Sequence, residues 1–117
     1  RSIYRFIVRT TPHQFMSTLD CPDPANLTPA RVQTTTALQA LTLSNNEFML
    51  EQAQHLVTRI GNETGDRETA IRRAFALAFQ RDATAVEMNA SAALVSEQGL
   101  FALCRMLINA NEFVYLD

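Results

Sequence analysis

The sequence predicts an all-α protein, a compact bundle of about five to six helices with a proline-containing loop near residues 20–29. Apolar residues recur at three- and four-residue spacing over most of the chain after residue 29, which is the spacing of one helix face. Residues that cap helices precede these apolar runs, and all four prolines fall between positions 12 and 29. No stretch shows a convincing strand pattern, so we expect helices alone.

Length and composition describe a single globular domain over residues 1–117, with 47% hydrophobic residues to form its core. Ten basic and 12 acidic residues give no electrostatic reason to bind nucleic acid or an anionic membrane. No apolar run is long enough for membrane insertion by this segment. Because the chain starts at Arg1 without a methionine or a leader, we expect an excised C-terminal fragment of a longer multidomain protein.

The first part of the chain predicts short helices and a loop. Residues 2–10 carry a mixed apolar pattern that favours a short helix, which Pro12 would end. Residues 13–19 can form one more turn, with the apolar side chains of Phe15, Met16 and Leu19 turned inward. Two prolines and two carboxylates within residues 20–24 are typical of a loop that crosses the surface.

Residues 36–44 are apolar on nearly every side, which is typical of a buried helix. We therefore place this helix at the centre of the bundle. Asn45 and Asn46 should break it, and one of them can cap the next helix, predicted over residues 47–60. Gly61 should close that helix in a left-handed conformation.

Three further helices follow. Asp66 stands at the N-cap position of a helix over residues 67–80. Thr84-Ala85-Val86-Glu87 fits a capping box, so another helix should run from about residue 85 to Gln98, with Gly99 as the break. The last amphipathic segment starts at Leu100 and should end near Asn111.

Potential metal ligands crowd the predicted loop, but their spacing matches no metal-binding motif. They are His13, Asp20, Cys21 and Asp23. Without a His-x-x-x-His or Cys-x-x-Cys pair, a turn stabilised by its own side chains explains them better, so we expect no metal site.

Two further candidates concern a base and the cysteines. Glu51 and His55 are four residues apart on one predicted helix, which suits either a general base or a solvated surface pair. Cys21 and Cys104 can form a disulfide in an oxidising compartment, or Cys104 can act as a small buried hydrophobe. The sequence leaves both questions open. No phosphate-binding, serine-hydrolase or haem-attachment motif is present, so no catalytic residue is assigned.

A set of polar residues surrounds the most apolar predicted helix, so several of them must find partners near the core. We interpret them as a structural capping network, with the floor of a binding site as the other possibility. Its candidate members are Arg31, Gln33, Thr34, Thr36, Gln39 and Asn45, with Asn109, Asn111 and Glu112 as a possible second half.

Several motifs spread over essentially the whole chain carry a resemblance to known proteins. They are Arg1-Ser2-Ile3-Tyr4, Asp20-Cys21-Pro22-Asp23, the stretch from Arg31 to Phe48, Glu51-Gln52-Ala53, Arg73-Ala74-Phe75 with Thr84-Ala85-x-Glu87, and the stretch from Leu107 to Phe113. Together they resemble the C-terminal region of a planctomycete-type family of large, often secreted bacterial proteins. In that family a domain of unknown function like this one follows another uncharacterised domain and, in many cases, a cytochrome-c-like module.

The resemblance has consequences and two departures. It implies a bacterial, extracytoplasmic protein, either periplasmic or secreted, whose haem c would be bound elsewhere in the parent chain, because this segment lacks Cys-x-x-Cys-His. No cofactor is therefore expected in this segment. Ala37 stands where the family commonly has proline, and Gln80-Arg81-Asp82-Ala83 replaces the usual Gly-Arg-x-Pro connection.

Two functions are compatible with these observations. The first is a non-catalytic helical module that packs against the upstream domain of the same polypeptide and helps to assemble an extracytoplasmic complex. Such a complex would handle polysaccharide or take part in cytochrome-associated processes, and other extracytoplasmic proteins are further candidate partners. The second function is one wall of an active site or ligand site that the upstream domain completes, with Arg31, Gln39 or His13 facing the substrate. The first predicts an apolar docking patch and the second a polar concavity.

Overall fold

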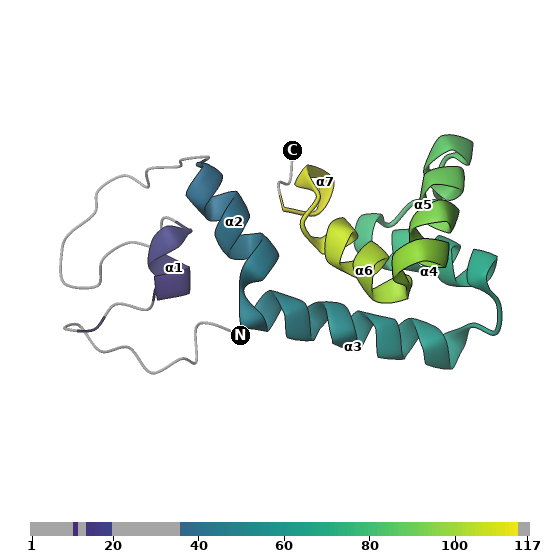
Figure 1. Cartoon of the computed structure of the whole chain (residues 1–117), viewed down its shortest axis with the longest axis horizontal. Helices are drawn as coiled ribbons and strands as arrows, with labels where there is room; N and C mark the ends of the chain where they lie inside the picture. Colours follow the sequence, from purple (N-terminus) through teal and green to yellow (C-terminus); the bar gives the residue numbers. More distant parts are fainter. Residues whose placement is uncertain (1–10, 12–13, 20–35, 115–117) are drawn as a thin grey trace. The chain divides into compact units, whose positions relative to one another are not determined.

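The computed structural model describes residue 11, residues 14–19 and residues 36–114. The chain divides into two compact units, Arg1–Leu43 and Ser44–Asp117, and each is described by itself. Every regular element in the described ranges is a helix (Figure 1). The predicted all-α fold class is therefore confirmed. The predictions for residues 2–10 and for the loop at 20–29 lie outside the described residues.

In the first unit, helix α1 spans Gln14–Thr18 and helix α2 starts at Ala37 and extends to Asn45, across the boundary between the units. A reciprocal pair of hydrogen bonds starts α2. The Thr36 backbone N–H donates to Gln39 Oε1 at 3.0 Å, and the Gln39 N–H donates to Thr36 Oγ1 at 3.2 Å. This is the geometry of a capping box with Thr36 as the first member.

Helix α2 forms where it was predicted, but the prediction that it is the buried central helix is wrong. Leu38 is 64% exposed and Leu41 is 58% exposed, and Gln39 is the one residue of α2 that is buried. The apolar stripes of other helices bury one another instead, so the core does not require the leucines of α2. An apolar composition on all sides predicts burial only where a partner surface remains to be covered.

The second unit contains five helices after the end of α2. They are α3 (Glu47–Glu63), α4 (Arg67–Phe79), α5 (Ala85–Gln98), α6 (Leu100–Ile108) and α7 (Asn111–Val114). No helix in the described ranges is both long and apolar enough to cross a bilayer.

Side-chain caps start three of these helices at the residues that the sequence predicts. The Asn46 side chain accepts a hydrogen bond from the Phe48 N–H at 3.0 Å and so caps α3. Asp66 accepts a hydrogen bond from the Thr69 N–H at 3.0 Å at the start of α4. Thr84 forms the predicted capping box at the start of α5. Each cap satisfies backbone donors that have no partner within the helix.

The ends of the helices agree less well with prediction. Helix α3 does not stop at Gly61 but continues to Glu63, whose carboxylate pairs with Arg59 at 3.0 Å and with Arg73 at 2.6 Å. The backbone N–H and the hydroxyl of Thr64 both donate to the Ile60 carbonyl and end the helix. Gly99 ends α5 and separates it from α6 as predicted, with a φ of 85° that suits glycine. Gln80 ends α4 in the left-handed region, with a φ of 57°.

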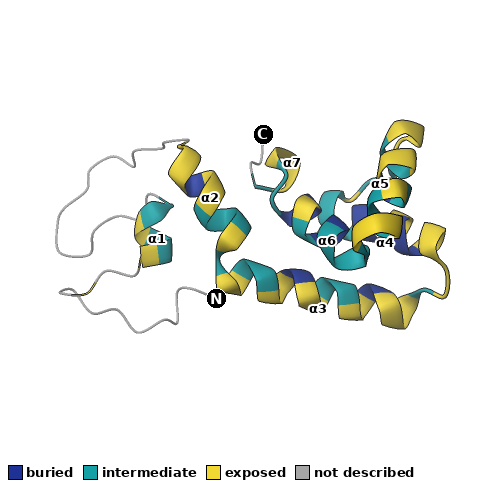
Figure 2. Cartoon of the chain, in the orientation of Figure 1, coloured by how far each residue is buried: buried dark blue, intermediate teal, exposed yellow. Residues whose placement is uncertain are grey.

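Helices α4 and α6 each pack against all four other helices of the second unit, and α6, with four of its nine residues buried, lies at the centre of the core. Figure 2 shows buried positions on α3, α4 and α6, the three helices that supply the apolar core. The fully or nearly fully buried apolar residues are Ala53, Ile60, Ala70, Ile71, Ala74, Phe75, Leu103, Cys104, Leu107 and Ile108.

Two leucine truncations distinguish this core from the predicted one. Leu103→Ala removes a side chain with no solvent exposure, so we expect it to lower the free energy of unfolding by about 2 to 5 kcal/mol. Leu38→Ala truncates an exposed side chain of α2 and should change it by no more than about 0.5 kcal/mol. Urea denaturation measures both. If both variants lost the same free energy of unfolding, α2 would belong to the core after all.

The left-handed backbone conformation of Gln80 gives a second test of the fold. Glycine adopts this conformation without steric cost, so Gln80→Gly should raise the free energy of unfolding by about 1 kcal/mol. The same replacement at Gln52, an exposed position inside α3, should lower it by about 1 kcal/mol, because glycine is a poor helix former. Thermal unfolding of both variants tests the opposite signs, and a loss of stability in Gln80→Gly contradicts the expectation.

Candidate functional site

Of the polar residues predicted around residues 36–44, the structure describes Thr36, Gln39 and Asn45. Arg31 and Thr34, like Gln33 and His13, lie outside the described residues. Thr36 and Gln39 are engaged with each other in the capping box of α2. The amide of Gln39 therefore serves the start of a helix, and its side-chain oxygen is bonded to a backbone N–H as a structural role requires.

Asn45 and Asn109 are connected through an arginine that sequence reasoning missed. Arg105 on α6 donates from Nε and Nη2 to the Ser44 carbonyl at 3.2 and 2.9 Å, and from Nη2 to Asn45 Oδ1 at 3.2 Å. Asn109 Nδ2 in turn donates to the Arg105 carbonyl at 2.7 Å. Asn109 Oδ1 is buried and has no hydrogen-bond partner among the described residues. The Arg105 guanidinium thus joins α6 to the end of α2, which is a structural task.

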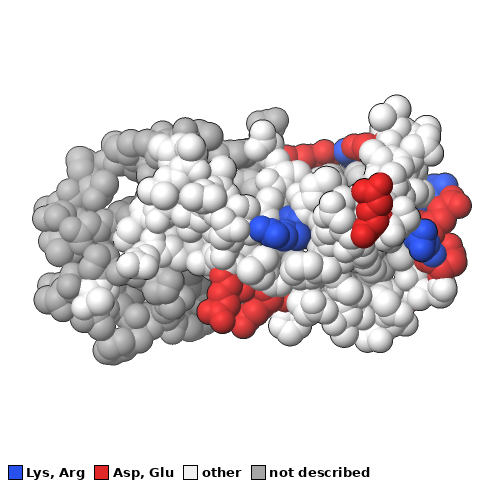
Figure 3. Space-filling model, in the orientation of Figure 1, with Lys and Arg blue, Asp and Glu red and all other residues white. Residues whose placement is uncertain are grey.

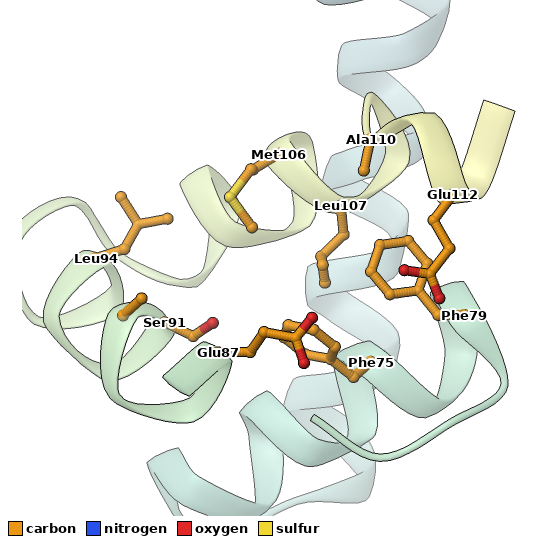
Figure 4. A pocket seen from close by; sticks show the side chains of 10 residues that line it. Phe75, Phe79, Glu87, Ser91, Leu94, Met106, Leu107, Ala110 and Glu112 are labelled. Carbon is orange, nitrogen blue, oxygen red and sulfur yellow. The ribbon is translucent and has the colours of Figure 1, made fainter. Parts of the chain in front are cut away.

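Glu112 does not belong to the group around Arg105 but lines a pocket of about 380 Å³. The pocket lies between α4, α5, α6 and α7 in the second unit (Figure 4). Three polar side chains contribute to its lining: Glu87 and Ser91 from α5 and Glu112 from α7. The rest of the lining is apolar and consists of Phe75, Phe79, Ala90, Leu94, Met106, Leu107 and Ala110. Carboxylates next to a hydrocarbon surface make this pocket the candidate site.

Arg81 holds both carboxylates of the pocket. Its Nη1 and Nη2 donate to the two oxygens of Glu87 at 3.0 and 2.8 Å. Its Nε and Nη2 donate to the two oxygens of Glu112 at 2.7 and 2.8 Å. Glu87 also accepts the Thr84 backbone N–H at 2.7 Å in the capping box of α5. One guanidinium thus ties the connection after α4 to the first turn of α5 and to α7 by paired hydrogen bonds.

The aromatic rings of α4 support this arginine. The guanidinium carbon of Arg81 lies 5.8 Å from the ring centroid of Phe75 and 5.3 Å from that of Phe79. The two rings meet edge to face, with centroids 5.6 Å apart. A guanidinium at this distance from a ring is attracted by its negative face, so the rings help to keep Arg81 in place.

The arginine determines the ionisation of the pocket. Hydrogen bonds from Arg81, with further ones from Thr84, lower the pKa of Glu87 from 4.5 to about 2. The hydrogen bonds of Arg81 also lower the pKa of Glu112, and the carboxylates of Glu112 and Glu87 raise the pKa of Arg81. Both carboxyl groups are therefore ionised at neutral pH, where Glu87 in particular cannot act as a proton donor.

The other predicted candidates do not assemble into a catalytic site. Glu51 and His55 are both exposed on α3, and no hydrogen bond joins them. Cys104 is a free thiol without solvent exposure, and burial raises its pKa to about 11, so it stays protonated at neutral pH. Asp20, Cys21 and Asp23 lie outside the described residues. Within the described ranges no group of three or more His, Cys, Asp or Glu side chains is placed to hold a metal ion.

Acidic and basic side chains are interspersed over the second unit. On the face drawn in Figure 3 they form small groups among large uncharged areas. Several are ion pairs: Arg72 with Glu68 at 2.9 Å, and Glu63 with both Arg59 and Arg73. Exposed pairs of this kind contribute little stability and mark no binding site.

Sequence reasoning missed Arg81 and Ser91 as members of the site. A signal for Arg81 was present, because the connection Gln80-Arg81-Asp82-Ala83 departs from Gly-Arg-x-Pro at the glycine and the proline but keeps the arginine. For Ser91 the sequence offers no signal, since a serine within a helix pattern is ordinary.

Fold and pocket together define an all-helical domain with two ionised carboxylates held at an apolar pocket by one arginine. The chain belongs to the family described as PSD1, protein of unknown function (DUF1553), which matches residues 1–95. The expected resemblance to a family with a domain of unknown function is thereby confirmed. The matched part includes Arg81 and Glu87, whereas Glu112 follows it. No curated protein and no solved structure matches the chain.

Replacing the arginine tests the electrostatics of the pocket. In Arg81→Met we expect the pKa of Glu87 to rise from about 2 towards 4.5, as followed by ¹³C detection of its side-chain carboxyl group. In the native chain the paired Glu87 stabilises the fold fully above its unfolded value of 4.5. That contribution is lost as the pH falls from 4.5 to about 2, because protonation of Glu87 removes the charge that Arg81 holds.

Arg72→Met is the matched control, since Arg72 pairs with Glu68 on α4 and does not contact the pocket carboxylates. It should leave the titration of Glu87 unchanged. A native Glu87 that titrates near its ordinary value would contradict the role given to Arg81.

Proposed function

We propose that this chain is a non-catalytic helical interaction module that packs against the upstream domain of the same polypeptide. The observation that carries the proposal is the exposure of large apolar side chains on three helices of the second unit. Val86 on α5 is 79% exposed, Met106 on α6 is 47% exposed and Phe113 on α7 is 43% exposed. Apolar side chains left in water at several places favour association with another protein surface.

Each of these three residues lies on a helix that contributes to the lining of the pocket. Met106 itself lines the pocket, and Val86 and Phe113 are the sequence neighbours of the lining residues Glu87 and Glu112. Because Arg81 fixes Glu87 and Glu112 relative to each other, the first turn of α5 and helix α7 are presented as one surface. A surface held in this way loses little conformational entropy when a partner covers it.

The state of the titratable groups supports a role without catalysis. The two carboxylates at the pocket are ionised and paired with Arg81, and the buried Cys104 thiol is protonated at neutral pH. A catalytic acid, base or nucleophile needs a pKa suited to proton transfer or nucleophilic attack near the working pH. Glu87, Glu112 and Cys104 do not have such a pKa.

The proposal places the module in a large exported bacterial protein of the planctomycete type, in a periplasmic or secreted location. This part of the proposal is supported by the motifs between Arg1 and Phe113 described above. Any haem c belongs to another part of such a parent chain, and the assembled protein serves polysaccharide handling or a cytochrome-associated process. Other extracytoplasmic proteins are possible further partners.

Amide hydrogen exchange tests the docking. We expect the amides of α7 and of the first turn of α5 to exchange more slowly in the longer parent polypeptide than in the 117-residue chain, because the upstream domain covers them. Val86→Asp in the parent should restore faster exchange there. Aspartate in the first turn of a helix is favourable, so the helix itself is kept.

Ala93→Asp is the matched control, since Ala93 is exposed on the same helix and does not line the pocket. It should leave the protection in the parent unchanged. Identical exchange of α5 and α7 in the parent and in the 117-residue chain would contradict the docking proposal.

A further inference from the structure

We propose that the pocket between α4, α5, α6 and α7 binds a small molecule that carries a primary ammonium group on a hydrocarbon body. The structure brings three hydrogen-bond acceptors together at an apolar wall: the Ser91 hydroxyl and the carboxylates of Glu87 and Glu112. A primary ammonium group has three donors and no acceptor, so its hydrogen-bonding capacity matches this set. The inference goes beyond the docking of an upstream domain and does not depend on it.

The Ser91 hydroxyl is the observation that points to a ligand. Ser91 is only 4% exposed, lines the pocket, and makes no hydrogen bond to any other described residue. Figure 4 shows its oxygen on the pocket side of α5. Other hydroxyls on helices of this unit behave differently, since Thr58 and Ser96 donate to backbone carbonyls of their own helix. The Ser91 hydroxyl is therefore open to the pocket and free to bond a ligand there, on a side chain that is otherwise covered.

The two carboxylates still have acceptor capacity after Arg81 is bound. Glu87 accepts two bonds from Arg81 and one from the Thr84 N–H, and Glu112 accepts two from Arg81. An ionised carboxylate offers about four acceptor positions. Glu87 and Ser91 are four residues apart on α5, so one face of that helix presents both acceptors on consecutive turns.

The charge of the pocket favours a cation. Two carboxylates and one guanidinium leave one negative charge, and the residues that line the pocket include no basic side chain. This charge stands beside hydrocarbon surface from Leu94, Met106 and Leu107 in a pocket of about 380 Å³. An ammonium group on an apolar body therefore satisfies the charge and covers the wall at the same time.

A series of hexyl compounds tests this assignment on the 117-residue chain, with amide ¹H–¹⁵N chemical shifts as the readout. Hexylamine should bind saturably and shift amides of α5, α6 and α7 around the pocket. Hexan-1-ol should bind about tenfold more weakly, because it lacks the charge. Hexanoate should bind more weakly still. Hexyltrimethylammonium has the charge without donors and should lie between hexylamine and hexan-1-ol.

Ser91→Ala separates hydrogen bonding from charge. It should weaken hexylamine binding by about twofold to tenfold, the effect of one hydrogen bond, and leave hexyltrimethylammonium binding unchanged. The variant should fold, since it removes a hydroxyl that has no partner among the described residues. Ser96→Ala on the same helix, exposed and outside the pocket, should change neither affinity.

Three results would overturn the proposal. The first is equal affinity for hexylamine, hexan-1-ol and hexanoate, which would show a purely apolar pocket. The second is a set of shifts spread over surface carboxylates such as Glu47 and Glu97 instead of the pocket, which would show non-specific ion binding. The third is unchanged hexylamine binding in Ser91→Ala. None of these results bears on the docking of the upstream domain, which the exchange experiment tests separately.

Discussion

The burial of α6 is the constraint on which the second unit depends. This helix has nine residues, too few to be stable alone in water, and it is helical because four of them are buried against neighbouring helices. Gly99, with its positive φ, separates α6 from the end of α5 at one residue. The short connection makes α5 and α6 neighbours, and it places Met106 and Leu107 where they can form one wall of the pocket.

Arg81 provides the second constraint, at the edge of that core. Helix α7 has only four residues and none of them is buried, so hydrophobic packing contributes little to its position. The paired bonds between Arg81 and Glu112 hold it instead, and the same guanidinium holds Glu87 in the first turn of α5. An interaction that builds the pocket therefore also affects its chemistry, because it lowers the pKa of both carboxyl groups and leaves one negative charge beside apolar side chains.

The helix starts were predictable because their caps depend on residues close in sequence. The Thr84 capping box and the Asp66 N-cap involve positions three residues apart, and such spacings are visible in the sequence. Burial of residues 36–44 was predicted wrongly, because burial depends on which surfaces remain unpaired after the other helices pack. The predicted stop at Gly61 is wrong, because one glycine inside a helix costs only about 1 kcal/mol and α3 continues through it to Glu63.

The sequence by itself determined the helical class and most helix starts, since hydrophobic periodicity and capping are local properties of the chain. Only the tertiary structure decided which helix is central, that Glu112 pairs with Arg81 from 31 residues away in the sequence, and that Ser91 is largely buried at the pocket. These features arise when helices that are distant in sequence compete for the same apolar surface. Their outcome depends on the shape and size of all of the side chains together, and no short stretch of the sequence contains that information.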